Sequence, residues 1–206
     1  MLIAEINQLE AWCTDIGNAY LEAYTEELLY IIAGPEFGEL EGHTMIVVKA
    51  LYGTKTGGIR WWERFSKVLC KMGFYPSKAE DDIWMRDMGD HYEYITRYVD
   101  DLTMISRNPQ ELLRILCEEH HFKLKGNELI RYHLGSNFSR DEKGVVCMSP
   151  TKYIKHMMDN YICMFVSALK TLYRLPLERG NHLELDTSDE LDEEDTKKYQ
   201  SLIGAL

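Results

Sequence analysis

Two runs of β-prone residues, 92–99 and 102–106, are separated by only Asp100 and Asp101. Strand-like runs joined by so short a polar segment are typical of a β-hairpin. The sequence therefore predicts that both carboxylates project from the end of a rigid antiparallel pair of strands. Acidic residues in a tight turn usually serve the turn itself, so these residues alone leave both a structural and a functional role open.

A third acidic residue, Asp15, ends another short apolar stretch earlier in the chain. If the two strands are neighbours in one sheet, three carboxylates converge at one sheet end and repel one another unless cations neutralise them. Hard divalent ions take oxygen ligands, and two such ions about 4 Å apart are the standard device for in-line phosphoryl transfer. The pattern indicates a two-metal site, although Asp81 and Asp82 show that paired acids also occur elsewhere.

Helical and strand-like patterns alternate along the chain. Apolar spacing predicts a helix end in 1–9 and helices over about 57–73, 109–121 and 150–165. Buried strands are expected at 28–32 and 45–48, and further strands near 132–139 and 144–148. The predicted apolar side of the second helix consists of Ile59, Trp62, Phe65, Leu69 and Met72. Helices interleaved with hairpin-type strands favour an α+β fold over a doubly wound parallel sheet.

The net charge of −11 argues at first against a nucleic-acid partner. The charges are unevenly distributed, however. Residues 1–48 hold nine acids and no lysine or arginine, whereas residues 49–78 hold seven bases against one acid. A second basic stretch covers 143–179, and residues 184–195 hold eight acids and no base. Charged stretches of this kind are usually just solvent-exposed faces, so the charges alone do not decide the function.

The composition, 45% hydrophobic and 28% charged, excludes a disordered or low-complexity chain. No apolar run is long enough to span a bilayer and no basic segment opens the chain, so we expect neither a membrane partner nor a secretory signal. The five cysteines are widely spaced and form no C-x-x-C pair. They predict reduced core thiols in an intracellular protein, not disulfides or a zinc site.

Six segments resemble motifs of the reverse transcriptases of Ty1/copia-type retrotransposons, in the family's order and spacing. They are TDIGNAYLE at 14–22, VKALYGTK with RWW at 48–62, YVDD at 98–101, FKLK with YHLG at 122–135, MSPTKYI at 148–154 and SLIG at 201–204. Each segment alone is weakly specific, but together they cover nearly the whole chain. YVDD resembles the polymerase signature, and TDIGNAYLE the first catalytic motif.

The resemblance implies an α+β polymerase palm, with a ferredoxin-like antiparallel sheet and helices on one face, over 1–140. The end of the palm and the start of a thumb would follow over 141–206, including an acidic linker at 181–196. The implied activity is RNA-directed DNA polymerase, which transfers a nucleotide from a dNTP to a primer 3′-OH on an RNA or DNA template. Two Mg²⁺ ions are the implied cofactor, with Mn²⁺ as a substitute, in the cytoplasm (a retrotransposon particle) or the nucleus. No oligomeric state is indicated.

The catalytic residues implied by the resemblance are Asp15, Asp100 and Asp101. They would hold the two metal ions, with the main-chain carbonyl of Ile16 as an additional ligand.

Four residues are carried over as contacts of the incoming nucleotide. Tyr20 falls where the family has an aromatic residue under the sugar, and its ring would exclude a ribose 2′-OH; core packing is its alternative role. Gly53 would let the backbone approach the nucleotide closely, unless it is a plain turn glycine. Lys55 would place positive charge near the phosphates, and Tyr98 belongs to the signature itself.

The chain also departs from the family pattern. The family's Gln and Pro are missing from 54–58, and Arg97 replaces a usually apolar residue before the signature. Only 14 residues precede Asp15, so a fingers region upstream and RNase H regions downstream are expected to be truncated. One alternative is therefore a non-catalytic retroelement remnant that only folds or binds nucleic acid or protein. A more distant one is another two-metal enzyme on a similar palm, such as a nucleotide cyclase.

Overall fold

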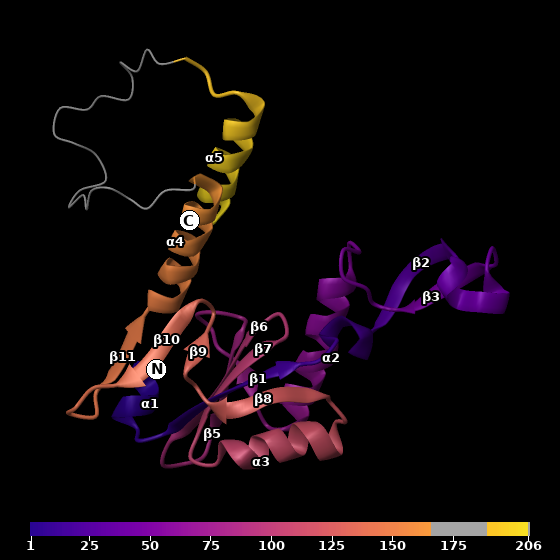
Figure 1. The fold of residues 1–206 in the computed structure, drawn as a ribbon. Helices are drawn as coiled ribbons and strands as arrows, with labels where there is room; N and C mark the ends of the chain where they lie inside the picture. The colour runs from indigo at the N-terminus through magenta and orange to yellow at the C-terminus, as the bar shows by residue number, and fades with distance from the viewer. Residues whose placement is uncertain (166–188, 206) are drawn as a thin grey trace. The chain divides into compact units, whose positions relative to one another are not determined.

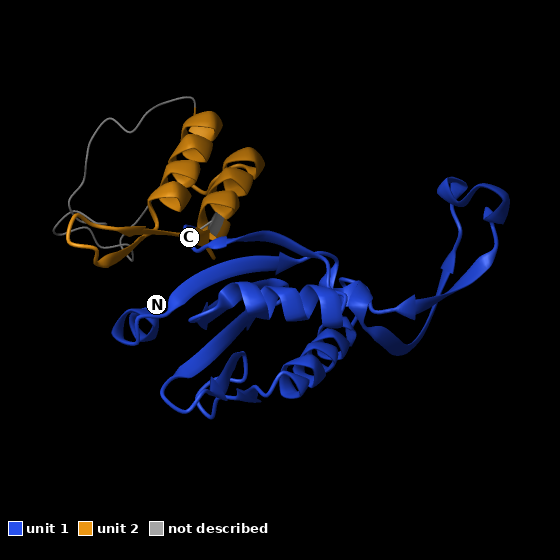
Figure 2. Cartoon of the chain, turned by 90° about the horizontal axis from the view of Figure 1, so that it is seen from below, with its two compact units in different colours: residues 1–131 blue, residues 132–206 orange. Residues whose placement is uncertain are grey.

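A computed structural model of the 206-residue chain describes residues 1–165 and 189–205. The chain divides into two compact units, residues 1–131 and residues 132–206, which are coloured separately in Figure 2. The first unit contains the hairpin with the paired acids and the first acidic strand. It therefore holds every residue that the sequence predicts for the site.

A six-stranded antiparallel sheet forms the centre of the first unit, with the strand order β4-β5-β6-β7-β1-β8 (Figure 1). Its strands are β1 (Glu10–Ile16), β4 (Tyr75–Pro76), β5 (Ile83–Asp87), β6 (Tyr92–Tyr98), β7 (Asp101–Ser106) and β8 (Leu124–Leu129). The predicted hairpin is β6 and β7, and its last cross-strand pair is Tyr98 with Asp101. The prediction of an α+β fold with an antiparallel sheet is confirmed.

Helices α2 (Gly57–Lys71) and α3 (Pro109–Arg114), the latter continued by η3 (Ile115–Glu119), contribute to one core cluster with this sheet. The side chain of Asn108 accepts a hydrogen bond from the Glu111 N–H and so caps α3, and Pro109 opens it. Both helices were predicted. The cluster contains Ile16, Trp61, Phe65, Val68, Leu69, Met72, Trp84, Ile95, Leu102, Met104, Leu112, Leu116 and Phe122.

The buried side of α2 differs from the predicted one. Ile59 is 54% exposed and Trp62 is 37% exposed, whereas Trp61 is fully buried. Trp61, Phe65, Val68 and Leu69 follow the i, i+4, i+7, i+8 spacing of one helix face, which places Trp62 at its edge.

A smaller cluster lies on the other face of the sheet, where α1 (Leu2–Ile6) supplies Ala4. Ala4 packs there with Leu9, Ala11 of β1 and Ile105 of β7. The predicted helix end in 1–9 is thus confirmed, and the sheet has helices at both faces over different parts of its length.

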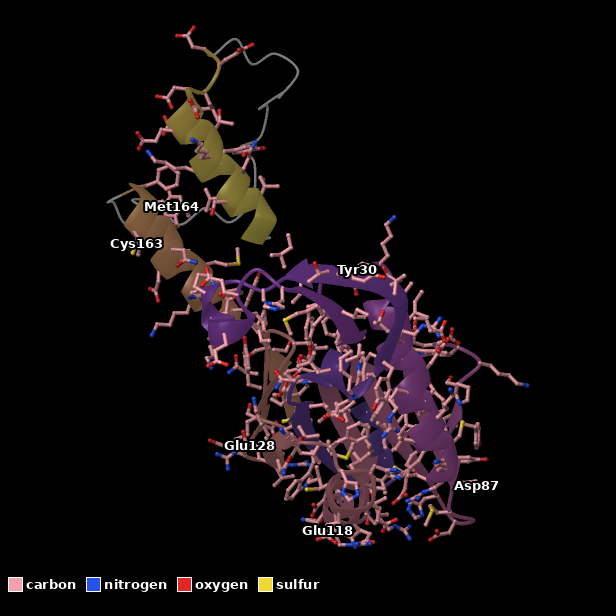
Figure 3. The ribbon with its side chains drawn as sticks, turned by 90° about the vertical axis from the view of Figure 1, so that its right-hand side faces the viewer. Tyr30, Asp87, Glu118, Glu128, Cys163 and Met164 are labelled. Carbon is pink, nitrogen blue, oxygen red and sulfur yellow. The ribbon has the colours of Figure 1, made fainter. Side chains whose placement is uncertain are left out.

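Strands β2 (Tyr24–Ile32) and β3 (Thr44–Lys49) form a separate two-stranded sheet that extends away from the six-stranded one (Figure 1). The short helices η1 (Ala19–Glu22) and η2 (Pro35–Leu40) lie before and within this segment. The strands were predicted correctly but their burial was not, because Leu28, Ile32 and Val48 are 71%, 76% and 62% exposed. Two strands alone have no second layer to bury an apolar face against. Tyr30, labelled in Figure 3, is one of these exposed side chains.

The second unit has a three-stranded sheet of β9 (Tyr132–His133), β10 (Ser136–Arg140) and β11 (Val146–Ser149), followed by α4 (Thr151–Phe165) and α5 (Glu193–Ala205). The run predicted as one strand at 132–139 is broken at Leu134 and Gly135, whose φ angles are 45° and 78°. Of the predicted acidic linker, residues 181–188 lie outside the described residues. Residues 193–196 belong to α5, whose first turn carries three acids that the helix dipole favours there.

The cysteines were predicted as reduced core thiols. All five are free, but Cys13 is half-buried and Cys70, Cys117, Cys147 and Cys163 are exposed, so their placement in the core was wrong. None of the helices in residues 1–165 and 189–205 combines the length and the apolar character that a membrane span needs.

Candidate active site

Asp15 and Asp101 lie directly opposite each other on neighbouring strands, as the last cross-strand pair of β1 and β7. The N–H of Ile16 donates a hydrogen bond to the carbonyl oxygen of Asp100, 2.9 Å away. The ends of β1 and β7 are thereby tied together, and all three acidic residues meet at one end of one sheet. The predicted proximity of Asp15 to the hairpin turn is confirmed.

The carboxylates of Asp15 and Asp101 point away from helices α2 and α3. Successive strand residues face opposite sides of a sheet, and Ile16 and Leu102 belong to the core under these helices. Their neighbours Asp15 and Asp101 therefore face the other side, and both are half-buried. The Asp–Asp pair is thus accessible from a face that the two helices leave open.

On this open face, the potential at Cys13 is negative. Cys13 precedes Asp15 on the same side of β1, and its thiol pKa is raised by burial and by the carboxylates of Glu128 and Asp101. Glu128, labelled in Figure 3, lies on β8 opposite Cys13. Such a potential favours cations, as a metal site requires.

Lys125 supplies a positive charge beside the pair and was missed as a site residue, although it lies within one of the quoted motifs. It stands opposite Asp15 on β8. Its side chain covers Gly17, where a Cβ would lie 3.2 Å from the Lys125 Cε and 3.5 Å from its Nζ. Asp15 is therefore flanked by an acid on one neighbouring strand and by a base on the other.

The turn between β6 and β7 is held by α2. Val99 has a φ of 58°, which is unfavourable for a β-branched residue. The buried Trp61 Nε1 donates a hydrogen bond to the Val99 carbonyl oxygen over 2.7 Å. Trp61 therefore links the helix core to the turn that carries Asp100. This contact was not predicted, because the predicted apolar side of the helix contained Trp62 instead of Trp61.

Tyr20 and Tyr52 form a stacked pair next to Asp100. Their ring centroids are 4.0 Å apart with an interplanar angle of 4°, and the Tyr52 hydroxyl donates to Asp100 Oδ2 over 3.4 Å. Partial burial and the Asp100 charge raise the pKa of Tyr52, which keeps its hydroxyl protonated and able to donate. Tyr20, predicted as a sugar contact, is thus connected to the acidic turn through Tyr52.

The start of α2 approaches Tyr20 closely because Gly57 and Gly58 carry no side chains. A Cβ at Gly57 would lie 2.5 Å from the Leu51 carbonyl oxygen, and one at Gly58 would lie 3.2 Å from the Tyr20 hydroxyl. The glycines that replace the family's residues at 57 and 58 therefore fit the observed packing of the loop and of Tyr20.

We expect Gly57→Ala to destabilise the protein by about 1–3 kcal/mol, because the new methyl group meets backbone rather than a movable side chain. Gly204→Ala in α5 is the matched control: its Cβ meets nothing within 4 Å, and alanine favours a helix. Urea unfolding of both variants checks this. Equal stability of Gly57→Ala and the unaltered chain would contradict the packing described.

The other predicted nucleotide contacts lie in the same part of the chain. Gly53 has a φ of 84° and a Cβ there would meet nothing within 4 Å, so the turn requires the residue and leaves open space beside it. Lys55 is exposed just before α2. Tyr98 is 61% exposed and pairs with Asp101 across the hairpin.

The charge of Arg97 is mostly buried, but it has an acidic partner. Its guanidinium forms an ion pair with Asp82, and its main-chain N–H donates to the Asp82 carbonyl oxygen over 3.0 Å. The second acidic doublet thus has a structural partner that compensates for the departure at Arg97.

The oxygen ligands at the sheet end fit a hard divalent cation by their chemistry. Asp15 and Asp101 also fit by their register, whereas the carboxylate of Asp100 is directed to Tyr52. In the described residues no three His, Cys, Asp or Glu side chains already form a metal-binding cluster. Asp15 and Asp101 are therefore cross-strand neighbours, and Asp100 lies beside them on the turn.

The sequence of this chain matches the family described as "Reverse transcriptase (RNA-dependent DNA polymerase)" over residues 2–167. It is 27% identical over 196 residues to the "Putative transposon Ty5-1 protein YCL074W" of Saccharomyces cerevisiae, covering 93% of this chain and 61% of that protein. It is 24% identical over 195 residues to the "Retrovirus-related Pol polyprotein from transposon RE1" of Arabidopsis thaliana, covering 93% of this chain and 13% of the polyprotein.

A third relative is the "Transposon Ty1-MR1 Gag-Pol polyprotein" of Saccharomyces cerevisiae, 27% identical over 211 residues, with 92% of this chain and 11% of the polyprotein covered. The chain thus spans only a small part of the two polyproteins. The family match covers most of the chain and includes the strands with Asp15 and Asp101 and the turn with Asp100. The chain belongs to the reverse transcriptase (RNA-dependent DNA polymerase) family, in its Ty1/copia retrotransposon branch.

Proposed function

We propose that this chain is the RNA-directed DNA polymerase domain of a retrotransposon Pol protein, extending a DNA primer on an RNA or DNA template with dNTPs. The observation that carries the proposal is the pairing of Asp15 with Asp101 at a sheet end whose adjoining turn holds Asp100. The pair lies on a face not covered by α2 and α3, as access for a primer and a nucleotide requires.

The first unit would form most of the polymerase palm, with a ferredoxin-like arrangement. Its support is the order of elements β1, α2, β6, β7, α3 and β8 along the chain, combined with the spatial order β8-β1-β7-β6. This is the pattern of a split β-α-β-β-α-β motif, with both helices on one side. The palm would occupy residues 1–140, and 141–206 would be its end and the start of a thumb.

Asp15, Asp100 and Asp101 would hold two Mg²⁺ ions, with Mn²⁺ as a substitute and the Ile16 carbonyl as an additional ligand. Bound there, the ions would lower the pKa of the primer 3′-OH and hold the triphosphate. The protein's own contribution is positioning. The strand register fixes two carboxylates, Trp61 fixes the turn of the third, and Lys125 lies beside Asp15.

The nucleotide would lie against Tyr20, whose ring would exclude a 2′-OH. Gly53 would allow close approach of the backbone, and Lys55 would face the phosphates. Tyr98 beside Asp101 would contact the same substrate. The protein would act in a cytoplasmic retrotransposon particle or in the nucleus.

Primer extension is the direct test of the proposed function. With oligo(dT) on poly(rA), dTTP and Mg²⁺, we expect weak extension that disappears when EDTA removes the metal. Extension that persists in EDTA, or that is equal in an Asp15→Asn variant, would contradict the assignment of the site.

Binding to a primer–template duplex should fall steeply with salt and depend little on sequence. The basic stretch 49–78, with seven bases against one acid, would neutralise backbone phosphates, and each contact releases counterions. Fluorescence anisotropy between about 50 and 200 mM salt measures the slope. A Lys55→Ala, Lys67→Ala double variant should make the plot of log affinity against log salt concentration less steep by about 1.8, the contribution of two phosphate contacts. A slope unchanged by this variant would contradict the prediction.

A non-catalytic retroelement remnant is the second candidate, and the specific observation in its favour is that the Asp100 carboxylate is engaged by the Tyr52 hydroxyl. Such a remnant only folds, or binds nucleic acid or protein, and it predicts neither primer extension nor divalent-ion binding at the acidic sheet end. The two candidates are therefore separated by the metal titrations described below.

A further inference from the structure

Tyr52 connects two residues that the proposed function places on different parts of the substrate. Its ring stacks on Tyr20, with centroids 4.0 Å apart and planes within 4° of parallel. Its hydroxyl reaches Asp100 Oδ2 at 3.4 Å. One side chain therefore contacts both the residue assigned to the sugar and a residue assigned to the metal.

Core packing does not account for Tyr52, because the residue is 52% exposed and belongs to neither buried cluster of unit 1. Tyr20, in contrast, packs against the main core. The exposed ring of Tyr52 thus covers the outer face of a half-buried ring, and its hydroxyl lies at the acidic turn.

Resting on the proposed function, we propose that Tyr52 is a positioning residue with two separable roles: its ring fixes Tyr20 for sugar selection, and its hydroxyl orients the carboxylate of Asp100 for the metal. The substrate class to which the first role applies is the 2′-deoxynucleoside triphosphate.

The ring role follows from the confinement of Tyr20. The Tyr52 ring covers one face of Tyr20, and the backbone of Gly57 and Gly58 approaches from α2, where a Cβ at Gly58 would lie 3.2 Å from the Tyr20 hydroxyl. A ring that excludes a single hydroxyl group must be held in place, since a misplacement of about 1 Å in an active site can already cost about 100-fold in rate. Of these contacts of Tyr20, the one with Tyr52 is made by a side chain, so a substitution can remove it.

The hydroxyl role follows from the chemistry of a phenol beside a carboxylate. A neutral phenol donates one hydrogen bond to Oδ2 and leaves Oδ1 for a cation, without cancelling the negative charge as a lysine would. Hydrogen bonds to a ligating carboxylate orient it, and their loss costs about 10- to 100-fold in metal affinity. The 3.4 Å separation is long, and bonds of this kind tighten when the substrate complex forms.

Two substitutions at Tyr52 separate these roles in the 206-residue chain. Tyr52→Phe keeps the ring and removes the hydroxyl, whereas Tyr52→Leu removes both. Mn²⁺ binding is followed without nucleotide, because dTTP itself chelates the ion, by the electron paramagnetic resonance signal of free Mn²⁺. Sugar selection is followed as the ratio of dTTP to ribo-TTP affinities, by displacement of a fluorescent dTTP analogue.

We expect Tyr52→Phe to weaken Mn²⁺ binding by about tenfold and to leave the sugar ratio unchanged. Tyr52→Leu should weaken Mn²⁺ binding equally and move the sugar ratio towards one. Gly58→Ala should leave Mn²⁺ binding unchanged and move the sugar ratio towards one, because its methyl group displaces the Tyr20 ring without touching Asp100. Tyr75→Phe, on the edge strand β4, is the matched control and should change neither quantity.

Mn²⁺ binding by Tyr52→Phe that equals or exceeds that of the unaltered chain would overturn the hydroxyl role. An unchanged sugar ratio in Tyr52→Leu would overturn the ring role. Asp15→Asn distinguishes these results from failure of the proposed function. If the unaltered chain binds no Mn²⁺, or if Asp15→Asn binds it as well, the metal site itself is wrong and the proposal for Tyr52 falls with it.

Discussion

Asp15→Asn should reduce metal-dependent primer extension by more than about 100-fold, since even groups that only support a metal ligand contribute 10- to 100-fold. An amide is neutral and holds a hard divalent ion far more weakly than a carboxylate does. The fold should remain intact and its stability should change little, because Asp15→Asn removes both the repulsion from Asp101 and the attraction to Lys125.

The matched control is Asp81→Asn, the same chemical change in the other acidic doublet, at an exposed position. We expect it to leave extension and Mn²⁺ binding unchanged. Because extension by this chain is expected to be weak, Mn²⁺ binding is measured on the same samples. If Asp15→Asn unfolds the chain, the residue is structural and its assignment as a metal ligand is wrong.

Arg86→Met should destabilise the first unit by about 3–5 kcal/mol, the cost of leaving a buried charge without its partner. Glu93 is only 5% exposed, and its carboxylate accepts hydrogen bonds from the Arg86 guanidinium and from the Ser106 hydroxyl. Arg86 also donates to the Met72 carbonyl oxygen over 2.9 Å, at the end of α2, and lies over the Phe74 ring. Removing its charge leaves Glu93 with one neutral donor.

Two further variants test this explanation by urea unfolding. Arg114→Met removes an arginine that pairs with Glu111, Glu118 and Glu119 at the surface, and should change stability by less than about 1 kcal/mol. The double variant Arg86→Met, Glu93→Leu should recover most of the loss, because no buried charge remains. If the double variant is as unstable as Arg86→Met alone, packing rather than the unpaired charge explains the loss.

The acidic sheet end could be predicted because local and long-range signals agree there. The strand runs around Asp100 and Asp101 specify a hairpin, and Asp15 at the end of an apolar strand needs only one neighbouring strand to join them. The assignment of roles came from the family motifs, which carry information that strand patterns do not.

Burial was harder to predict than secondary structure. The apolar pattern of Leu28–Ile32 is that of a buried strand, but its burial depends on a second layer, which β2 and β3 lack in the described residues. In α2, Trp61 and Trp62 are equally apolar, so one residue of error in the helix phase exchanges the buried ring for the exposed one.

Other contacts could not be inferred from a single sequence at all. Strand β8 was not predicted because Lys125, Gly126 and Asn127 are poor strand formers, and an edge strand tolerates them. The pairing of Asp15 with Lys125 was missed as a result. The stacking of Tyr20 on Tyr52 joins the short helix η1 to the turn before α2, and neither segment has a periodic pattern that would predict the contact.

The most direct test of the account is a crystal structure of this chain with Mn²⁺ and dTTP, with anomalous diffraction recorded at the manganese absorption edge. We expect manganese peaks at the end of β1 and β7, within coordination distance of the Asp15 and Asp101 carboxylates, with one oxygen of Asp100 as a further ligand. Manganese bound elsewhere, or bound at the hairpin turn without Asp15, would contradict the claim that these three carboxylates form a polymerase metal site.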